Sequence, residues 1–218
     1  MKKLTTLLLG ALFSFQVFAT EVSKEDPYTM IEEVANITFT RVANSQSDIR
    51  ANPNMLKDVV REELIPYVDY RYAALKVLGT NLKSIDKKDL NAFIPVFKEY
   101  LVTSYGQVFT LYNNQEVRFE PPKPTGNKKI VAIQTLVLEP GREPISIAFK
   151  VRKNRKTNEW RAFDMIAEGV SLLDSKQAEL SSLIRQKGLP YVTQILLEKS
   201  EQDISFSNPV EIPGQNAN

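Results

Sequence analysis

Two carboxylates stand four positions apart in the stretch RAFDMIAEGVSLL, residues 161–173: Asp164 and Glu168. Strand residues an even number of positions apart share a face, so both side chains could point into one cavity. A paired-carboxylate glycosidase or another acid–base enzyme would use such a pair. Because 25% of the residues are charged, this spacing arises often by chance. We therefore expect the two acids to hold a corner of the fold together through hydrogen bonds or ion pairs.

Composition removes most other catalytic chemistry. The chain contains no cysteine and no histidine. Thiolate nucleophiles, Ser-His-Asp triads and nearly all zinc sites are therefore excluded, and disulfides cannot stabilise the fold. We predict no catalytic residue, no metal ligand and no cofactor, so the protein is not expected to be an enzyme.

A tyrosine-rich segment and a basic cluster are two further candidate sites. Three tyrosines in PYVDYRYAALKVLG, residues 66–79, could ring a ligand mouth, or could pack a helix edge against a sheet, which we favour: Tyr67, Tyr70 and Tyr72. Four cations in one hairpin could touch anionic lipid headgroups or an acidic partner, although such a cluster is more often a solvated tip: Arg152, Lys153, Arg155 and Lys156.

The first residues predict export. Lys2 and Lys3 precede an apolar run that ends near Phe18, and Val17 and Ala19 suit a cleavage site. This order is typical of a secretory signal peptide over residues 1–19, and a retained anchor is the alternative. Its removal leaves 26 basic and 26 acidic residues. A neutral chain lacks the basic excess that nucleic-acid binding requires.

The elements that position the candidate residues include helices in the N-terminal and C-terminal parts of the chain. Apolar spacing predicts helices from Pro27 to about Ser47, from Asn54 to Leu64 and over residues 66–79, with Gly79 as a C-cap. Asp86 and Asp89 have capping spacing before a long helix in which Gly106 marks a close contact or a bend. Helices return at Ser171, whose spacing to Asp174 also suits a cap, and after Gly188. The tail, residues 201–218, is polar and predicted to be disordered.

Strands fill the middle of the chain. Residues 130–140, 145–151 and 159–169 alternate or are β-branched, and 117–120 is a further short strand. These features predict an α+β fold: a curved antiparallel sheet of about four strands, wrapped by N- and C-terminal helices. The expected shape is an NTF2-like or cystatin-like cone, with residues 20–200 as one domain.

The inside of that cone would be an apolar pocket or a solid core, and periodicity does not separate the two. We predict that a ligand pocket is lined by one face of the strands and by the long helix. The predicted lining residues are Phe93, Phe97, Leu101, Val108, Val131, Ile133, Val137, Ile147, Phe149, Val151, Phe163 and Met165.

Three segments, in this order, resemble motifs of the MlaC family of periplasmic phospholipid-binding proteins, which includes toluene-tolerance auxiliary components. They are YVDYRYAALKVLG (67–79), FIPVFKEYLVTSYGQVFTLY (93–112) and FDMIAEGVSLL (163–173). The resemblance covers about residues 27–198 and identifies residues 20–200 as a lipid-binding domain.

The resemblance implies a monomeric periplasmic carrier without cofactor or metal, which binds the acyl chains of a phospholipid between the sheet and the helices. It further implies exchange of lipid with an inner-membrane ABC transporter complex and an outer-membrane lipoprotein–porin complex, in support of outer-membrane lipid asymmetry. Two alternatives stay open: an enzyme that uses Asp164 and Glu168, and a periplasmic adaptor or chaperone with an apolar groove for peptides.

Overall fold

The computed structural model describes residues 21–207, so the predicted signal peptide and residues 208–218 lie outside the described part. Helices precede and follow a sheet, which confirms the predicted α+β order. The elements are α1 (Pro27–Asn44), α2 (Gln46–Ala51), α3 (Met55–Val59), η1 (Val60–Leu64), η2 (Ile65–Tyr67), α4 (Tyr70–Leu78), η3 (Gly79–Ser84), α5 (Lys87–Phe109), β1 (Glu116–Phe119), β2 (Ile130–Leu138), β3 (Ile145–Lys153), β4 (Trp160–Ala167), β5 (Val170–Ser171), α6 (Leu172–Lys187) and α7 (Leu189–Glu201).

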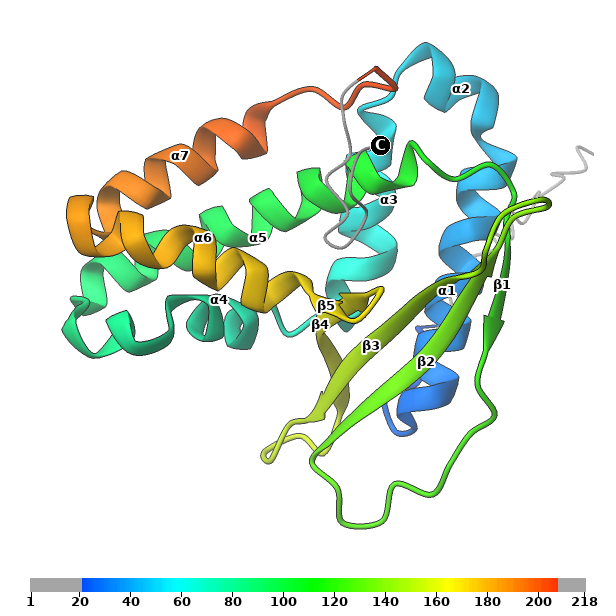
Figure 1. Ribbon diagram of the computed structural model, residues 1–218, viewed down its shortest axis with the longest axis horizontal. Coiled ribbons are helices and arrows are strands. Elements are labelled where there is room, and N and C mark those ends of the chain that lie inside the picture. The colour runs from blue at the N-terminus through cyan, green and yellow to red at the C-terminus, as the bar shows by residue number, and fades with distance from the viewer. Residues whose placement is uncertain (1–20, 208–218) are drawn as a thin grey trace, which may run out of the picture.

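The sheet is an antiparallel meander in the order β1-β2-β3-β4-β5. It therefore has five strands where the sequence predicted about four, because a two-residue strand follows β4. Helix α1 lies along one face of the sheet, and α4, α5, α6 and α7 form a separate layer beyond β4 (Figure 1). The protein thus has two parts, a sheet with α1 and a layer of helices, which meet at β4 and again where α3 and η1 lie between α1 and α5.

Local capping signals begin several helices. Asp26 accepts a hydrogen bond from the backbone N–H of Thr29, and Pro27 occupies the first turn of α1. Ser171 likewise accepts from Asp174 N at the start of α6, as its spacing predicted. Asp86 precedes α5, but its side chain makes no capping bond there, so the predicted cap between Asp86 and Asp89 is not formed.

The prediction of a helix over residues 66–79 was wrong for its first turn. Asp69 is the N-cap of α4 and accepts from Tyr72 N, so this helix begins at Tyr70. Before it, Val68 is extended and forms a parallel bridge with Ala162 of β4. A pairing between residues so far apart in sequence leaves no local signal. The end of the helix was predicted correctly, because Gly79 is the C-cap with φ 53°.

Two main hydrophobic clusters fill the two parts. The helical cluster joins α4, α5, α6 and α7 with one residue of β4, and its fully buried members include Phe93, Phe97, Leu180 and Leu196. The sheet cluster joins α1 to the strands. Its buried members are Val22, Tyr28, Met30, Ile31, Val34, Tyr67, Val131, Ile133, Val151 and Trp160.

The segment after α7, residues 202–207, packs across α3 and α5. Ile204 is buried, Asn54 of the α2–α3 turn accepts from Ile204 N at 2.9 Å, and Gln107 of α5 accepts from Ser205 N at 3.1 Å. A Cβ on Gly106 would stand 3.3 Å from Ile204 and 3.5 Å from the α3 backbone, so this glycine marks the close contact that its position suggested. Residues 202–207 therefore do not have the disordered character predicted for the tail.

Candidate functional site

The face of the sheet that α1 covers, called here the inner sheet face, is apolar across three strands. Strand register pairs Val131 with Val151, Ile133 with Phe149, and Phe149 with Met165. Seven of the predicted lining residues share this face: Val131, Ile133, Val137, Ile147, Phe149, Val151 and Met165. The inner sheet face is therefore a continuous apolar surface, as the alternation in the sequence predicted.

Burial changes from one end of the inner sheet face to the other. Val131, Ile133 and Val151 are buried against Met30, Ile31 and Val34 from the N-terminal half of α1, whereas Val137, Ile147, Phe149 and Met165 are half-buried. Thr135, which is not among the predicted lining residues, lies between these ends and donates through its hydroxyl to Ile147 O at 3.0 Å. The half-buried end is the part of the face with apolar surface still available.

The other five predicted residues lie elsewhere. Phe93 and Phe97 stack with ring centroids 5.5 Å apart inside the helical cluster, and Leu101 packs against it. Val108, two turns further along α5, is half-buried. Phe163 belongs to the helical cluster because a β-bulge opposite Lys150 and Val151 shifts the register of β4. The twelve predicted residues are thus divided between the two parts, and the structure does not bring them into one pocket.

Tyr105 is a residue that sequence reasoning missed, although it lies four positions after Leu101 on the same side of α5. It packs in a small cluster with Val60, Ile65 and Val102 between α5 and the η1–η2 segment. Burial of its hydroxyl, with a smaller contribution from the Asp164 charge, raises the pKa of Tyr105 to about 12. The C-terminal half of α5 therefore presents a neutral phenol in an apolar setting.

The Asp164 carboxylate is almost fully enclosed and serves the corner between β4 and α6. It accepts from Ser171 Oγ at 2.8 Å, from Leu173 N at 3.1 Å and from Lys150 Nζ at 3.0 Å. Its side chain is 1% exposed. The contact with Leu173 N satisfies a backbone donor at the N-terminus of α6, the Ser171 hydroxyl bond holds the N-cap residue, and the lysine balances the charge.

Glu168 and Gly169 form the tight turn into β5. Both adopt left-handed backbone conformations, with φ 48° and 80°, and the Glu168 carboxylate accepts from Ser146 N of β3. Asp164 and Glu168 therefore bind separate partners, and both hold this corner together, as the sequence analysis favoured. Among residues 21–207, no three acidic, histidine or cysteine side chains gather as a metal site.

The three tyrosines diverge and do not ring a common mouth. The Tyr67 hydroxyl accepts from Val22 N at 2.9 Å in the sheet cluster, and Tyr72 packs edge-on against Phe163 at 5.0 Å. Tyr70 packs against the helical cluster and the small cluster around Val102. Each ring fixes α4 or the segment before it to a neighbouring element, which confirms the packing role that we favoured.

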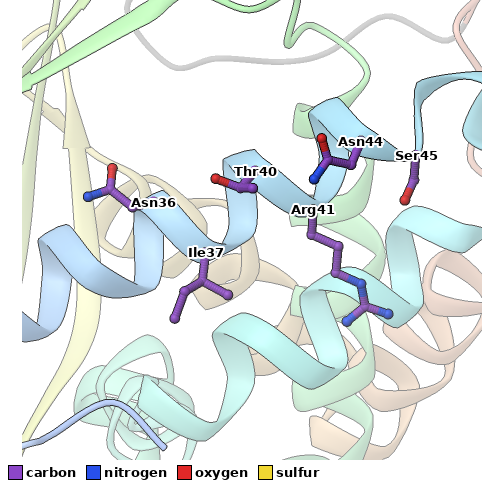
Figure 2. Close-up of a pocket in the computed structure, with 6 residues that line it drawn as sticks. All are labelled: Asn36, Ile37, Thr40, Arg41, Asn44 and Ser45. Atoms are coloured by element: carbon purple, nitrogen blue, oxygen red, sulfur yellow. The ribbon is translucent and has the colours of Figure 1, made fainter. Parts of the chain in front are cut away.

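Among the hollows on the surface of the described residues, two have a defined lining. One, of about 520 Å³, runs along α1 and is lined by Asn36, Ile37, Thr40, Arg41, Asn44 and Ser45 (Figure 2). Arg41 points from it to η1, where it pairs with Glu62 at 2.7 Å and Glu63 at 2.6 Å. The other, of about 390 Å³, lies between Tyr28 and residues 120–134. Of the twelve residues predicted to line a pocket, only Val131 borders either hollow.

No helix within residues 21–207 combines the length and the hydropathy of a membrane span.

Comparison with known proteins relates nearly the whole chain to one family. The family model described as "MlaC protein" matches residues 32–198. The intermembrane phospholipid transport system binding protein MlaC of Haemophilus influenzae is 31% identical over 208 residues, which are 95% of this chain and 97% of that protein.

A solved structure shares the fold. The phospholipid-binding protein of Ralstonia solanacearum, solved in complex with a phospholipid, superposes with a TM-score of 0.70 and 18% sequence identity. The match covers 80% of this chain and 97% of the other. This likeness establishes the curved sheet and its covering helices as an architecture that the two proteins have in common.

Proposed function

The chain belongs to the MlaC protein family, and we propose that it binds phospholipid and takes part in phospholipid transport between membranes. The observation that carries this proposal is the relationship to the Haemophilus influenzae binding protein, which extends over 95% of this chain. That relative is named for intermembrane phospholipid transport, and the Ralstonia solanacearum protein of the same fold holds a phospholipid.

The finer proposal is a periplasmic shuttle. After loss of residues 1–19 the carrier exchanges lipid with an inner-membrane ABC transporter complex and an outer-membrane lipoprotein–porin complex, and so supports outer-membrane lipid asymmetry. The family resemblance of the three motifs and the signal-peptide pattern of the first residues support this assignment.

Lipid transport through water requires a shielded site. Two acyl chains hold on the order of 30 methylenes, and each costs about 0.8 kcal/mol to expose, so roughly 24 kcal/mol opposes the free lipid. Apolar side chains can supply this shielding without any catalytic group. No covalent step is proposed, and Asp164 and Glu168 serve the architecture of the carrier.

We place the acyl chains along the half-buried end of the inner sheet face and the C-terminal half of α5. Val137, Ile147, Phe149 and Met165 offer apolar surface there, and Leu101 and Val108 offer it from α5. Phe93, Phe97 and Phe163 are already buried in the helical cluster, so in this proposal they pack behind the lining residues and do not contact the lipid. Entry of a lipid then requires the sheet with α1 to move away from the helical layer.

The first test is direct. The purified protein is extracted with organic solvent, the extract is analysed for phospholipid, and the stripped protein is offered a fluorescent phospholipid. We expect co-purified lipid and saturable uptake. A protein that carries no lipid and takes up none would overturn the proposed function.

The second test compares neighbours on one strand. Val137 is half-buried on the inner sheet face, whereas Leu136 is 43% exposed on the opposite face. We expect Val137→Asp to lower lipid occupancy at least tenfold, because a carboxylate in an acyl site costs several kcal/mol. Leu136→Asp, the matched control, should retain its lipid. Equal lipid occupancy in the two variants would show that the acyl chains do not bind at the inner sheet face.

A further inference from the structure

One end of the sheet carries a group of cations, called here the basic tip: Lys128, Lys129, Lys153, Arg155 and Lys156. Two loops form it, the β1–β2 connection and the β3–β4 hairpin. They leave the sheet side by side, because Lys153 N donates to Lys129 O at 2.9 Å and Ile130 pairs with Arg152. In Figure 1 both loops project from the lower end of the sheet, away from the helical layer.

The charges of the basic tip are uncompensated within the described part of the chain, where none of the five has a carboxylate within 4.0 Å. Nearby acids already have other partners. Glu120 pairs with Lys123, Glu159 with Arg161, and Asp69 with Arg152.

The N-terminal segment also comes close, since Trp160 N donates to Lys24 O at 2.8 Å. In that segment Glu21 pairs with Lys24 and Asp26 caps α1, whereas Glu25 adds one exposed negative charge. Because the cap leaves the charge of Asp26 in place, two carboxylates without a cation partner stand against five free cations, and the tip keeps a net positive charge.

The opposite end of the sheet has the opposite sign. The β2–β3 turn carries Glu139 and Glu143 against Arg142, and Glu168 lies at the neighbouring β4–β5 turn. The chain without residues 1–19 has equal numbers of acidic and basic residues. The basic tip therefore arises because positive and negative charges lie at opposite ends of the strands, not because the protein has a basic excess. Composition alone does not reveal this separation of charge.

The hairpin presents its cations on an ordered frame. Asn154 N donates to Glu159 O at 2.8 Å, Asn158 N to Asn154 O at 2.9 Å, and Lys156 N to the Asn154 side chain at 2.8 Å. Behind the hairpin the Arg152 guanidinium lies 4.2 Å from the centroid of the Tyr72 ring and pairs with Asp69. The tip is thereby joined to α4 and to the helical layer.

We propose that the basic tip docks onto an anionic phospholipid bilayer. Four of its five cations are lysines, which act as point charges and suit a plane of phosphates. An acidic protein partner fits less well, because interface hot spots need aromatic or arginine anchors in pockets. Trp160 beside the tip is buried, and Ile130 is the large apolar side chain exposed there, at 49%. This goes beyond the proposed function, because a carrier that meets only protein complexes needs no membrane contact of its own.

Charge sets the size and the salt dependence of the effect. Each lysine near an anionic surface contributes about fivefold to the partition coefficient. Loss of three lysines should therefore lower binding about a hundredfold, and ions should screen the attraction within about 10 Å at 0.1 M salt.

The experiment measures co-sedimentation with phosphatidylcholine vesicles that contain or lack phosphatidylglycerol, at low and at high salt. The test variant is Lys128→Gln/Lys129→Gln/Lys156→Gln. Its matched control is Lys83→Gln/Lys87→Gln/Lys88→Gln, which removes three exposed lysines from η3 and the start of α5. We expect binding of the wild type only to the anionic vesicles at low salt, about a hundredfold loss in the test variant, and at most a few-fold loss in the control.

Three results would overturn the proposal: no binding of the wild type to anionic vesicles, equal losses in both variants, or binding to polyglutamate but not to vesicles, which would indicate an acidic protein partner. Lipid extraction from the same variants separates this proposal from the proposed function. Unchanged co-purified phospholipid with lost vesicle binding supports the docking role, whereas absence of lipid from every variant and the wild type contradicts only the carrier role.

Discussion

The helical cluster and the inner sheet face contain the same kinds of residues but differ in how they are covered. In the helical cluster, helices or strands enclose Phe93 and Phe97 on all sides. On the inner sheet face, α1 covers one end through Met30 and Ile31, whereas further along the helix Val42 packs with residues of α2, α3 and α5 instead. The sheet therefore ends in half-buried apolar residues. The apolar pattern is the same in both regions. What differs is whether a neighbouring helix or strand covers the apolar residues, and only the uncovered ones are able to receive a ligand.

The sharpest test of this comparison truncates one residue in each region. Phe97→Ala should lower the free energy of unfolding by about 3–5 kcal/mol, because it leaves a cavity in a closed core. Ile147→Ala should cost less than the roughly 2–5 kcal/mol typical of a fully buried isoleucine, because its side chain is only half-buried and leaves no closed cavity. Urea denaturation of both variants measures the difference, and equal costs would break the comparison.

The pH dependence of stability tests how well the C-terminal half of α5 is closed. The pKa of Tyr105 in the folded protein is about 12, above its ordinary value of about 10. Between these pH values the unfolded chain releases this proton while the folded chain keeps it, so stability falls as the pH rises. The full loss is roughly 2–3 kcal/mol at pH 12.

The control for this prediction is Tyr105→Phe, which removes the titrating hydroxyl. Denaturant midpoints of both proteins between pH 9 and about 12 should converge as the wild type loses its advantage. Parallel curves would mean that water reaches this hydroxyl and that the α5 wall is open.

The corner between the two regions should give the smallest effect. Asp164→Asn keeps the shape of the side chain but removes the charge that faces Lys150, so we expect a loss of about 1–2 kcal/mol and a lower melting temperature. Lipid occupancy should fall with it, because the corner positions the sheet against α6. An enzyme that uses Asp164 would instead keep its stability and lose turnover.

Signals close together in sequence predicted the elements well. The spacing of Ser171 and Asp174 located the start of α6, and Gly79 located the end of α4. Alternation in β2 and β3 identified the inner sheet face, because a strand repeats every two residues whatever lies above it.

Features that depend on distant partners were missed. The bridge between Val68 and Ala162 delays the start of α4, and the bulge in β4 moves Phe163 out of the inner sheet face. Polar composition suggested a disordered tail from residue 201, yet Asn54 and Gln107 bind the backbone of residues 204 and 205. The binding partner in each case is fixed only by the completed fold.

The packing of residues 202–207 has a consequence for the order in which the molecule matures. Asn54 meets Ile204 across 150 positions of sequence, and Lys57 Nζ donates to Ser200 O and Gln202 O. A nascent chain that has been made only as far as α6 lacks these partners, so the hydrogen bonds of Asn54 and Lys57 cannot yet form. Contacts across so many residues form late because they close a long loop. The protein should therefore stay incompletely packed until synthesis has passed residue 205.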